Sequence, residues 1–251
     1  IHVLDDFEIE QSNSGGYVVC RSGDLVDFDF ELGSSLHWNG NSALDSMLVV
    51  AEGCMLNDGG DGGWIEFNSA HVVLAPGSHV VSFRKNNFLN SWLEGSATSN
   101  YTVQWADLSF YQSRVLQVHV QSDYASFVFR NSVAELNEFN VNFGNYRLEA
   151  STFLSSSIVS KHLKSRSRIL QSGFYDSNAP VVDESLTELY VYQCNFSNHT
   201  TAIKKKGGRL RMRCNLIQSS DIGLVVEKGC LLYLGINDAA GFNTFSNLEY
   251  A

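Results

Sequence analysis

The sequence contains little proline, little cysteine and little charge. Its 251 residues include two prolines and five cysteines, and charged side chains make up 18%. So few prolines leave long stretches of backbone free to pair as β-strands. Ser, Asn, Val, Phe and Leu dominate, and the Ala, Glu, Lys and Leu bias of helical proteins is missing. The composition therefore predicts an all-β protein.

The cysteines are too few and too scattered for a disulfide framework. They follow no Cys-x-x-Cys or Cys/His metal pattern and stand at Cys20, Cys54, Cys194, Cys214 and Cys230. An odd, sparse set in a chain of this size is typical of small buried apolar residues. We favour unpaired cysteines, and a bridge between Cys194 and Cys214 stays open at this point.

Positive charge and long apolar runs are scarce as well. The net charge of −10 argues against nucleic-acid binding, because affinity for phosphates requires clustered cations. Lys204–Lys206, with arginines at 209, 211 and 213, is expected to be an exposed turn followed by the outward face of a strand. The sequence contains no apolar run of about 18 residues and therefore predicts no membrane-spanning helix. Because the sequence begins at Ile1 without an initiator Met or a signal peptide, we expect a mature or excised part of a larger protein.

The strongest positive signal is a repeat of about 21 residues, clearest in residues 189–226. Val191 in the first copy corresponds to Met212 in the second, and Phe196 corresponds to Ile217. Such a period without helical spacing is typical of a coil of short strands. In a parallel coil, equivalent residues of successive turns lie about 4.8 Å apart, so an apolar column forms the interior.

Similar units precede this stretch. We expect the apolar anchors to form one buried column, and they are Phe88, Phe110, Phe153, Phe174, Phe196 and Ile217. The interval from Phe110 to Phe153 is a double step, in which Phe129 is the candidate for the missing anchor. A second buried column is expected five residues before each anchor, at Phe83, Trp105, Leu148, Ile169, Val191 and Met212. Small polar residues after each anchor predict corners of the coil.

These features predict an all-β parallel β-helix, or solenoid, with about 21–22 residues per turn. We expect a single domain over residues 1–251, with less regular turns in residues 1–79 and regular turns in residues 80–251. A hexapeptide coil requires a strict six-residue repeat, and a propeller requires blades of about 40–50 residues. The single steps between the bulky anchors, each of about 21 residues, argue against both.

Two segments carry a resemblance to a known group of proteins. CNFSNHTTAI at 194–203 and CNLIQSSDIGLVVEKGC at 214–230 resemble the turns of right-handed parallel β-helix proteins of the pectate-lyase-like superfamily. The resemblance covers residues 80–247 and is closest to the repeat regions of secreted bacterial surface proteins. It implies a right-handed parallel β-helix but no particular function, because the superfamily includes polysaccharide lyases, glycoside hydrolases, phage tailspikes, adhesins and structural stalks.

No catalytic motif of the enzymes in that superfamily can be matched to the sequence. Glycoside hydrolysis requires two carboxyl groups about 5–10 Å apart. The acids that we consider for such a pair are Asp176, Asp183, Glu184 and Glu188, and exposed positions in corner loops are the preferred interpretation. We predict no catalytic residue and favour a protein that is not an enzyme.

Two groups of residues are candidate binding sites. Tyr190 and Tyr192 alternate with apolar residues, and Arg211 and Arg213 take outward positions one turn later. We predict that these four form a carbohydrate-binding surface, because sugars stack on flat rings, with ordinary packing between turns as the alternative. In the Gly-rich segment 57–63, expected to be a turn, Asp58 and Asp61 are candidate ligands for Ca²⁺, and no other cofactor is predicted.

We therefore expect a non-catalytic, extracellular β-helix module of a cell-surface or fibre protein. Its predicted partners are surface polysaccharide, further copies of itself or other parts of its parent protein. The alternatives are a polysaccharide lyase or glycoside hydrolase, and a tailspike-like or filament subunit.

Overall fold

A computed structural model describes residues 85–163, 165–235 and 241–249, and before residue 85 it describes the strands named below and residues 76–77. Contacts within the chain divide it into two compact units, residues 1–126 (unit 1) and 127–251 (unit 2). We describe the two units separately, and the expectation of a single domain stays a prediction. In both units the sheets are lettered A, B and C in the order in which the chain enters them along one turn.

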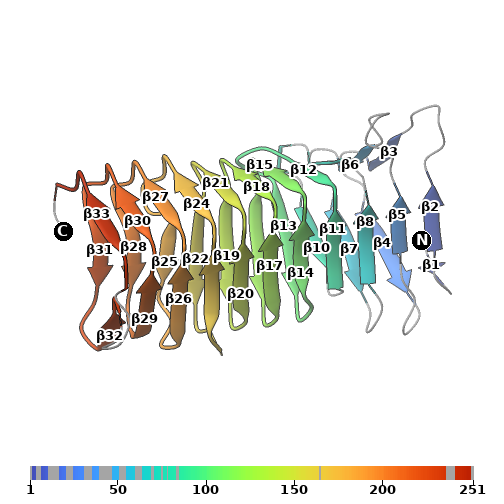
Figure 1. The fold of residues 1–251 in the computed structure, drawn as a ribbon. Coiled ribbons are helices and arrows are strands. Elements are labelled where there is room, and N and C mark those ends of the chain that lie inside the picture. The colour runs from blue at the N-terminus through green and yellow to red at the C-terminus, as the bar shows by residue number, and fades with distance from the viewer. Residues whose placement is uncertain are drawn as a thin grey trace. The chain divides into compact units, whose positions relative to one another are not determined.

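Unit 1 consists of three parallel sheets (Figure 1). Sheet A contains β1 (His2–Val3), β4 (Leu25–Phe30), β7 (Met55–Gly59), β10 (His79–Ser82), β13 (Asn100–Gln104) and β16 (His119–Asp123). Sheet B contains β2 (Phe7–Glu10), β5 (Leu36–Asn39), β8 (Trp64–Asn68), β11 (Lys85–Leu89) and β14 (Leu108–Tyr111). Sheet C contains β3 (Tyr17–Cys20), β6 (Met47–Val50), β9 (His71–Leu74), β12 (Trp92–Glu94) and β15 (Arg114–Leu116).

Unit 2 repeats the arrangement. Sheet A contains β19 (Glu138–Asn142), β22 (Ser157–Lys161), β25 (Val181–Asp183), β28 (Thr201–Lys205) and β31 (Ile222–Val226). Sheet B contains β17 (Ser126–Arg130), which begins at the unit boundary, β20 (Asn145–Glu149), β23 (Ser167–Leu170), β26 (Glu188–Tyr192), β29 (Gly208–Arg213) and β32 (Cys230–Tyr233). Sheet C contains β18 (Val133–Glu135), β21 (Thr152–Leu154), β24 (Gly173–Tyr175), β27 (Asn195–Ser197), β30 (Leu216–Gln218) and β33 (Thr244–Ser246).

The register of unit 2 confirms the predicted all-β solenoid and its period. Val191 pairs with Met212 on sheet B, and Phe196 pairs with Ile217 on sheet C, as the sequence repeat predicts. Each strand pairs in parallel with its counterpart on the next turn, so like residues lie above one another. The described residues contain no helix long and apolar enough to cross a membrane.

The predicted phenylalanine column is confirmed in unit 2. Phe153, Phe174, Phe196 and Ile217 are register partners on sheet C, and all four are 0% exposed. The ring centroids of Phe153 and Phe174 lie 4.7 Å apart, and those of Phe174 and Phe196 lie 4.9 Å apart. Stacking at the spacing of the turns explains why the same large side chain recurs.

The prediction that Phe88 and Phe110 belong to the same column is wrong. These two residues pair on sheet B of unit 1, where their ring centroids lie 4.7 Å apart, whereas Phe153 lies on sheet C. Turns are shorter near the middle of the chain, where Asn100 pairs with His119. Between Phe110 and Phe153 the inward phenylalanine therefore moves from sheet B to sheet C. Both sheets have inward positions that accept a large apolar side chain.

The second predicted column is confirmed in unit 2 and wrong at Trp105. Leu148, Ile169, Val191 and Met212 are register partners on sheet B with at most 2% exposure. Trp105 is 66% exposed, because it follows the last residue of β13 at a corner. Phe83 lies outside the described residues.

The corners confirm the predicted role of the small polar residues. The positions two residues after the anchors have φ between 45° and 63°, and they are Asn90, Gln112, Ser155, Asp176, Asn198 and Ser219. Positive φ bends the chain sharply and is uncommon outside glycine. The residue that follows such a position points inward and binds the turn before it. For example, the Ser91 N–H donates to the Ser113 hydroxyl at 3.1 Å.

The pairings of the N-terminal strands span stretches of chain of different length. Leu25 on β4 pairs with Met55 on β7, whereas His79 on β10 pairs with Asn100 on β13 after a clearly shorter stretch of chain. The predicted turn at residues 57–63 is wrong over 57–59, because these residues belong to β7.

Candidate functional site

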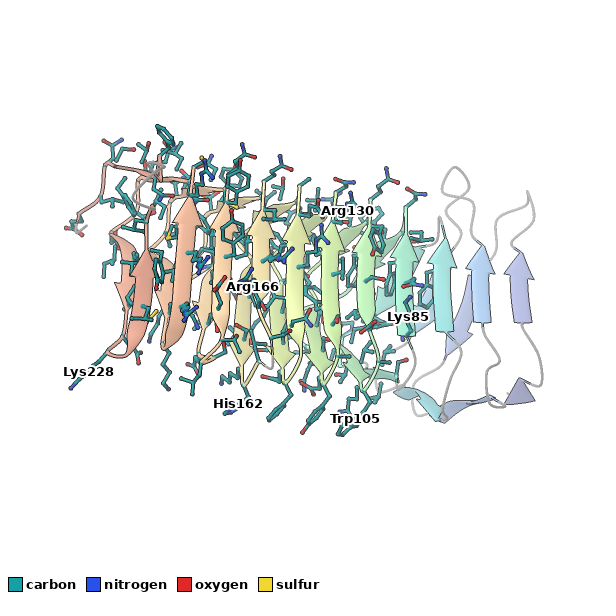
Figure 2. The ribbon with its side chains drawn as sticks, turned by 60° about the horizontal axis from the view of Figure 1, so that its bottom comes forward. Lys85, Trp105, Arg130, His162, Arg166 and Lys228 are labelled. Atoms are coloured by element: carbon teal, nitrogen blue, oxygen red, sulfur yellow. The ribbon has the colours of Figure 1, made fainter. Side chains whose placement is uncertain are left out.

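The outer face of sheet B in unit 2 is rich in arginine. Apart from Ser167, the inward positions on β20, β23, β26 and β29 hold buried apolar residues, so the alternating positions face solvent. Seven of the ten arginines in the sequence lie on these strands, on β17 or next to β23, and they are Arg130, Arg147, Arg166, Arg168, Arg209, Arg211 and Arg213. We call this surface, together with its tyrosines, the arginine–tyrosine face. Figure 2 labels Arg130 and Arg166.

The structure brings the four predicted binding residues together on this face. Tyr190 pairs with Arg211, and Tyr192 pairs with Arg213. The two tyrosine rings lie nearly parallel, with centroids 6.2 Å apart and planes 10° apart. On the next turn, the Arg211 guanidinium lies 5.2 Å from the ring centroid of Tyr233, a cation–π contact.

Two glutamates neutralise only part of this charge. Glu149 binds Arg147 at 2.9 Å and Arg130 at 3.6 Å. Glu188, whose side chain is 10% exposed, binds Arg166 at 2.7 Å and Arg211 at 3.4 Å. Each carboxylate is therefore shared between two guanidinium groups.

The remaining three arginines of the face form no ion pair within the part of the chain that the structure describes. These are Arg168, Arg209 and Arg213, all exposed. Seven arginines against two glutamates make this surface locally positive on a chain of net charge −10. Such a local surplus attracts anions and orients them over the face. The planar N–H forks of arginine match carboxylate and sulfate-like oxygens in two-point contacts.

Our four-residue prediction missed most of this face. The missed residues are Arg130, Arg147, Arg166, Arg168, Arg209 and Tyr233. The repeat of about 21 residues would have found several of them, because it places Arg147, Arg168 and Tyr190 at equivalent positions of successive turns. Successive outward positions on sheet B hold residues of different types, so these positions form no repeat that is visible in the sequence.

The acids considered for catalysis do not converge. Asp183 points into the core and is 0% exposed, which contradicts its interpretation as an exposed corner residue. Glu188 lies on the outer face of sheet B, bound to arginines. Asp176 lies at a corner with φ of 56°, and Glu184 contacts Lys161 at 4.0 Å. The arrangement offers no pair of carboxyl groups facing a common space among these four.

The basic cluster was also partly misinterpreted. Lys204 and Lys205 belong to β28, so the predicted turn is wrong at these two positions. Lys205 points inward and is 0% exposed, whereas Lys204 faces outward near Glu227 at 3.9 Å. The strand alternation overrides the preference of lysine for the surface.

The candidate calcium ligands lie at the N-terminal end of the chain, in unit 1. Asp58 lies in β7, but its side chain and all of Asp61 lie outside the described residues. Within the described residues, no group of three His, Cys, Asp or Glu side chains is arranged to hold a metal ion. The Ca²⁺ site stays a prediction.

Three cysteines can be compared with the expectation, because Cys54 and the side chain of Cys20 lie outside the described residues. Cys194, Cys214 and Cys230 are all unpaired, as expected, but Cys214 and Cys230 are partly exposed and not buried. Cys194 is buried and free, and Cys214 is free and partly exposed. Cys214 occupies a corner position with φ of 56°, whereas Cys194 lies one step further along its own turn and faces inward. Burial raises the pKa of the Cys194 thiol to about 12, so this sulfur is a structural group rather than a nucleophile.

A shallow hollow of about 320 Å³ lies at the corner between sheets C and A in unit 2. Its lining is polar and comprises Asp176, Ser177, Asn178, Asn198, His199, Thr200, Ser219 and Asp221. The Asn198 amide donates to Asp176 Oδ1 at 2.9 Å. The His199 ring faces the backbone instead, with Nδ1 2.9 Å from the Ser177 carbonyl oxygen and Nε2 3.1 Å from that of Phe174. His199 is therefore a corner residue and is not placed to act as a general base.

We expect His199 to make a pH-dependent contribution to stability. Burial lowers the pKa of its ring, and the two backbone carbonyls and Asp176 oppose this shift. The unfolded state therefore binds the proton more tightly than the folded state. The contribution of His199 to the free energy of unfolding is complete above the unfolded pKa of about 6.5 and decreases as the pH falls below that value. We expect urea midpoints of the wild type to fall between about pH 7.5 and pH 5.

The matched variant is His199→Ser, since Ser220 takes the equivalent position one turn later and binds the His199 N–H. This variant should lose the part of the pH dependence that belongs to the imidazole. An identical pH profile in the wild type and the variant would show that the ring does not titrate with folding.

Comparisons with known proteins identify no family. No protein-family model matches the sequence, and no curated protein matches it. Among solved structures, the chain is similar to the Streptococcus pneumoniae surface protein and adhesin PfbA, with 9% identity over 98% of this chain and 91% of that chain. The TM-score is 0.21, and we base no inference on this similarity.

Proposed function

We propose that this protein is a non-catalytic β-helix module that binds acidic polysaccharide through its arginine–tyrosine face. The observation that supports this most directly is the concentration of seven arginines on one sheet face of an otherwise acidic chain. Parallel strands repeat outward positions about every 4.8 Å, which suits a ligand with regularly repeated charges. The ligand chain would run across successive strands, along the axis of unit 2.

The tyrosines favour a sugar chain over other polyanions. Tyr190 and Tyr192 offer flat apolar surfaces beside the guanidinium groups of Arg211 and Arg213. Sugar rings stack on such surfaces while their acidic groups reach the arginines. Nucleic acid carries a much denser charge, and its binding depends on neutralising many phosphates, which the net charge of −10 opposes.

The proposed role is structural and adhesive, and we place the protein outside the cell, at the surface where polysaccharides lie. The acids that we considered for catalysis are buried, paired with arginine or separated, which supports a binding protein rather than a lyase or hydrolase. Membership of the pectate-lyase-like superfamily is part of this proposal. It rests on the sequence resemblance and the parallel solenoid.

The test is retention of the purified protein on immobilised heparin and on polygalacturonate, with dextran and duplex DNA as comparison ligands. We expect retention on one or both acidic polysaccharides, release by salt because exposed charge pairs are screened, and no retention on dextran. The variant Arg168→Ala/Arg213→Ala should bind about tenfold more weakly, since two exposed charge pairs are worth about 0.7 kcal/mol each.

Arg114→Ala provides the control on a different surface, because Arg114 lies on sheet C of unit 1. Equal losses in both variants would mean that net charge alone governs retention. Binding to DNA but to neither polysaccharide would contradict the proposed ligand class. Shortening of either acidic polysaccharide during incubation would contradict the non-catalytic part of the proposal.

A further inference from the structure

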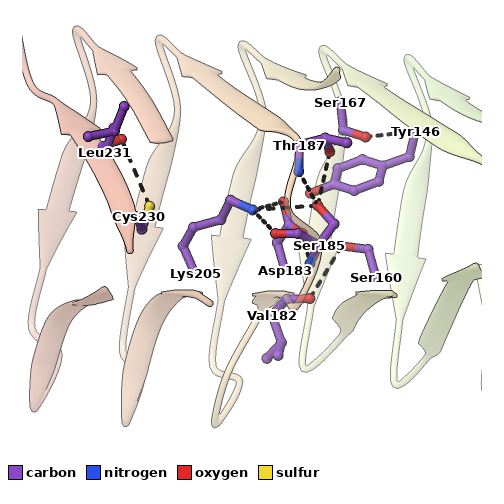
Figure 3. Close-up of polar contacts among 10 residues, drawn as sticks. All are labelled: Tyr146, Ser160, Ser167, Val182, Asp183, Ser185, Thr187, Lys205, Cys230 and Leu231. Atoms are coloured by element: carbon purple, nitrogen blue, oxygen red, sulfur yellow. Dashed lines mark hydrogen bonds and ion pairs between the residues drawn. The ribbon is translucent and has the colours of Figure 1, made fainter. Parts of the chain in front are cut away.

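The interior of unit 2 contains a lysine and an aspartate that no water reaches. Asp183 on β25 and Lys205 on β28 are register partners on adjacent turns of sheet A. Both side chains are 0% exposed, and Lys205 Nζ lies 3.3 Å from Asp183 Oδ2 (Figure 3). This site is separate from the arginine–tyrosine face, which lies on the outer surface of sheet B.

The segment after β25 fixes both reacting groups. The Ser185 N–H donates to Asp183 Oδ1 at 2.8 Å, and Lys205 Nζ donates to the Ser185 carbonyl oxygen at 2.6 Å. Asp183 Oδ2 accepts no hydrogen bond from the described residues, although the amine is close to it. The amine is therefore held beside the carboxyl group without being aligned in a hydrogen bond to that oxygen.

A buried phenol completes the site. The Tyr146 side chain points toward the pair (Figure 3) and is almost fully buried. Burial and, to a smaller extent, the charge of Asp183 raise the pKa of Tyr146 well above its usual value. The phenol therefore keeps its proton, and neither its oxygen nor Asp183 Oδ2 has a hydrogen-bond partner among the described residues.

Keeping two ions in this interior is costly. Removing a carboxylate and an ammonium from water costs several kcal/mol per ion, which their attraction offsets only with excellent geometry. Transfer of one proton from the ammonium to the carboxylate leaves a neutral amine and a neutral carboxylic acid in contact. These are the two reactants of an amide condensation, and no external oxidant or cofactor is required.

We propose that Lys205 and Asp183 form an intramolecular amide bond that links two adjacent turns. The neutral Nζ attacks the Asp183 carboxyl carbon, and the new C–N bond replaces the C–OH bond. The hydroxyl group leaves as water, taking a proton that originates on the amine and passes through the Tyr146 phenol. The product is an uncharged amide in which the Nζ–H can still donate to the Ser185 carbonyl oxygen.

The test is the intact mass of the wild-type protein after denaturation, which does not depend on any variant folding. We expect a mass lower than that of the sequence by one water. A tryptic digest should contain one branched peptide joining the segments around positions 183 and 205, with no cleavage after Lys205. The full mass, with the two peptides recovered separately, would overturn the proposal.

Controls within the same chain make the result specific. Lys205→Met should show its full mass. Lys204 and Glu227, an exposed pair at 3.9 Å, should appear in unlinked peptides, and a water lost there instead would assign the modification to the wrong pair. In Tyr146→Phe the bond should form more slowly after refolding, and an unchanged rate would remove Tyr146 from the step.

Discussion

Replacing Lys205 by methionine is expected to lower the free energy of unfolding by about 3–5 kcal/mol, because it removes the proposed link between β25 and β28 and leaves the Asp183 carboxyl group buried without its partner. Both side chains are 0% exposed, and they lie 3.3 Å apart between Nζ and Oδ2. The loss should appear as a lower urea midpoint at neutral pH. Raising the concentration of salt should not reproduce the loss, since an amide bond is covalent and any charge that remains at this buried site is poorly screened.

The double variant Lys205→Met/Asp183→Leu separates the cost of an orphaned charge from the value of the pair. Two apolar side chains of similar size should recover the part of the loss that is due to the orphaned carboxyl group, because removing both members of a buried pair is often close to neutral. Incomplete recovery would measure what the link between β25 and β28 adds. If Lys205→Met alone unfolds at the same urea concentration as the wild type, then the pair is not buried as described.

Replacing Phe174 by alanine should also cost about 3–5 kcal/mol, as expected for a buried phenylalanine. Phe174 lies between Phe153 and Phe196, with ring centroids 4.7 and 4.9 Å away. Its removal leaves a cavity that neighbours cannot fill, since stacked turns keep a fixed spacing. Urea unfolding measures the loss.

Phe242→Ala is the matched control in the same unit, because Phe242 is 69% exposed. It should change the free energy of unfolding by less than about 0.5 kcal/mol, as is usual for surface substitutions. Comparable losses in the two variants would argue that the sheet C column does not carry the stability of unit 2.

The period and the inward columns of unit 2 could be predicted because stacking forces like residues to recur. Val191 above Met212 and Phe196 above Ile217 are direct consequences of a shared axis. The assignment of columns to sheets failed where the length of a turn changed, as at Trp105, because a change in turn length moves a side chain from a strand into a corner. Amino-acid composition does not show where the length of a turn changes.

The functional face was harder to predict than the core. Side chains at outward positions face solvent and are not selected for packing. Register partners such as Arg168 and Tyr190 can therefore be residues of different types. The buried pair was hidden for the opposite reason. Lys205 stands in a run of three lysines, and Asp183 precedes Glu184, which favours the surface by composition alone. Only the alternation along β25 and β28 reveals that one member of each run faces inward.

The unequal turns have a consequence for how such a chain tolerates change. Val133 pairs with Thr152, whereas Ile158 pairs with Val181 across a longer stretch of chain, yet both pairings stay parallel. The additional residues of the longer turn lie in the segments that connect the strands, and such segments run over the surface. A peptide inserted beyond the end of β22 should therefore be accommodated as a protruding loop, whereas one added within β24 would displace every side chain that follows in that strand.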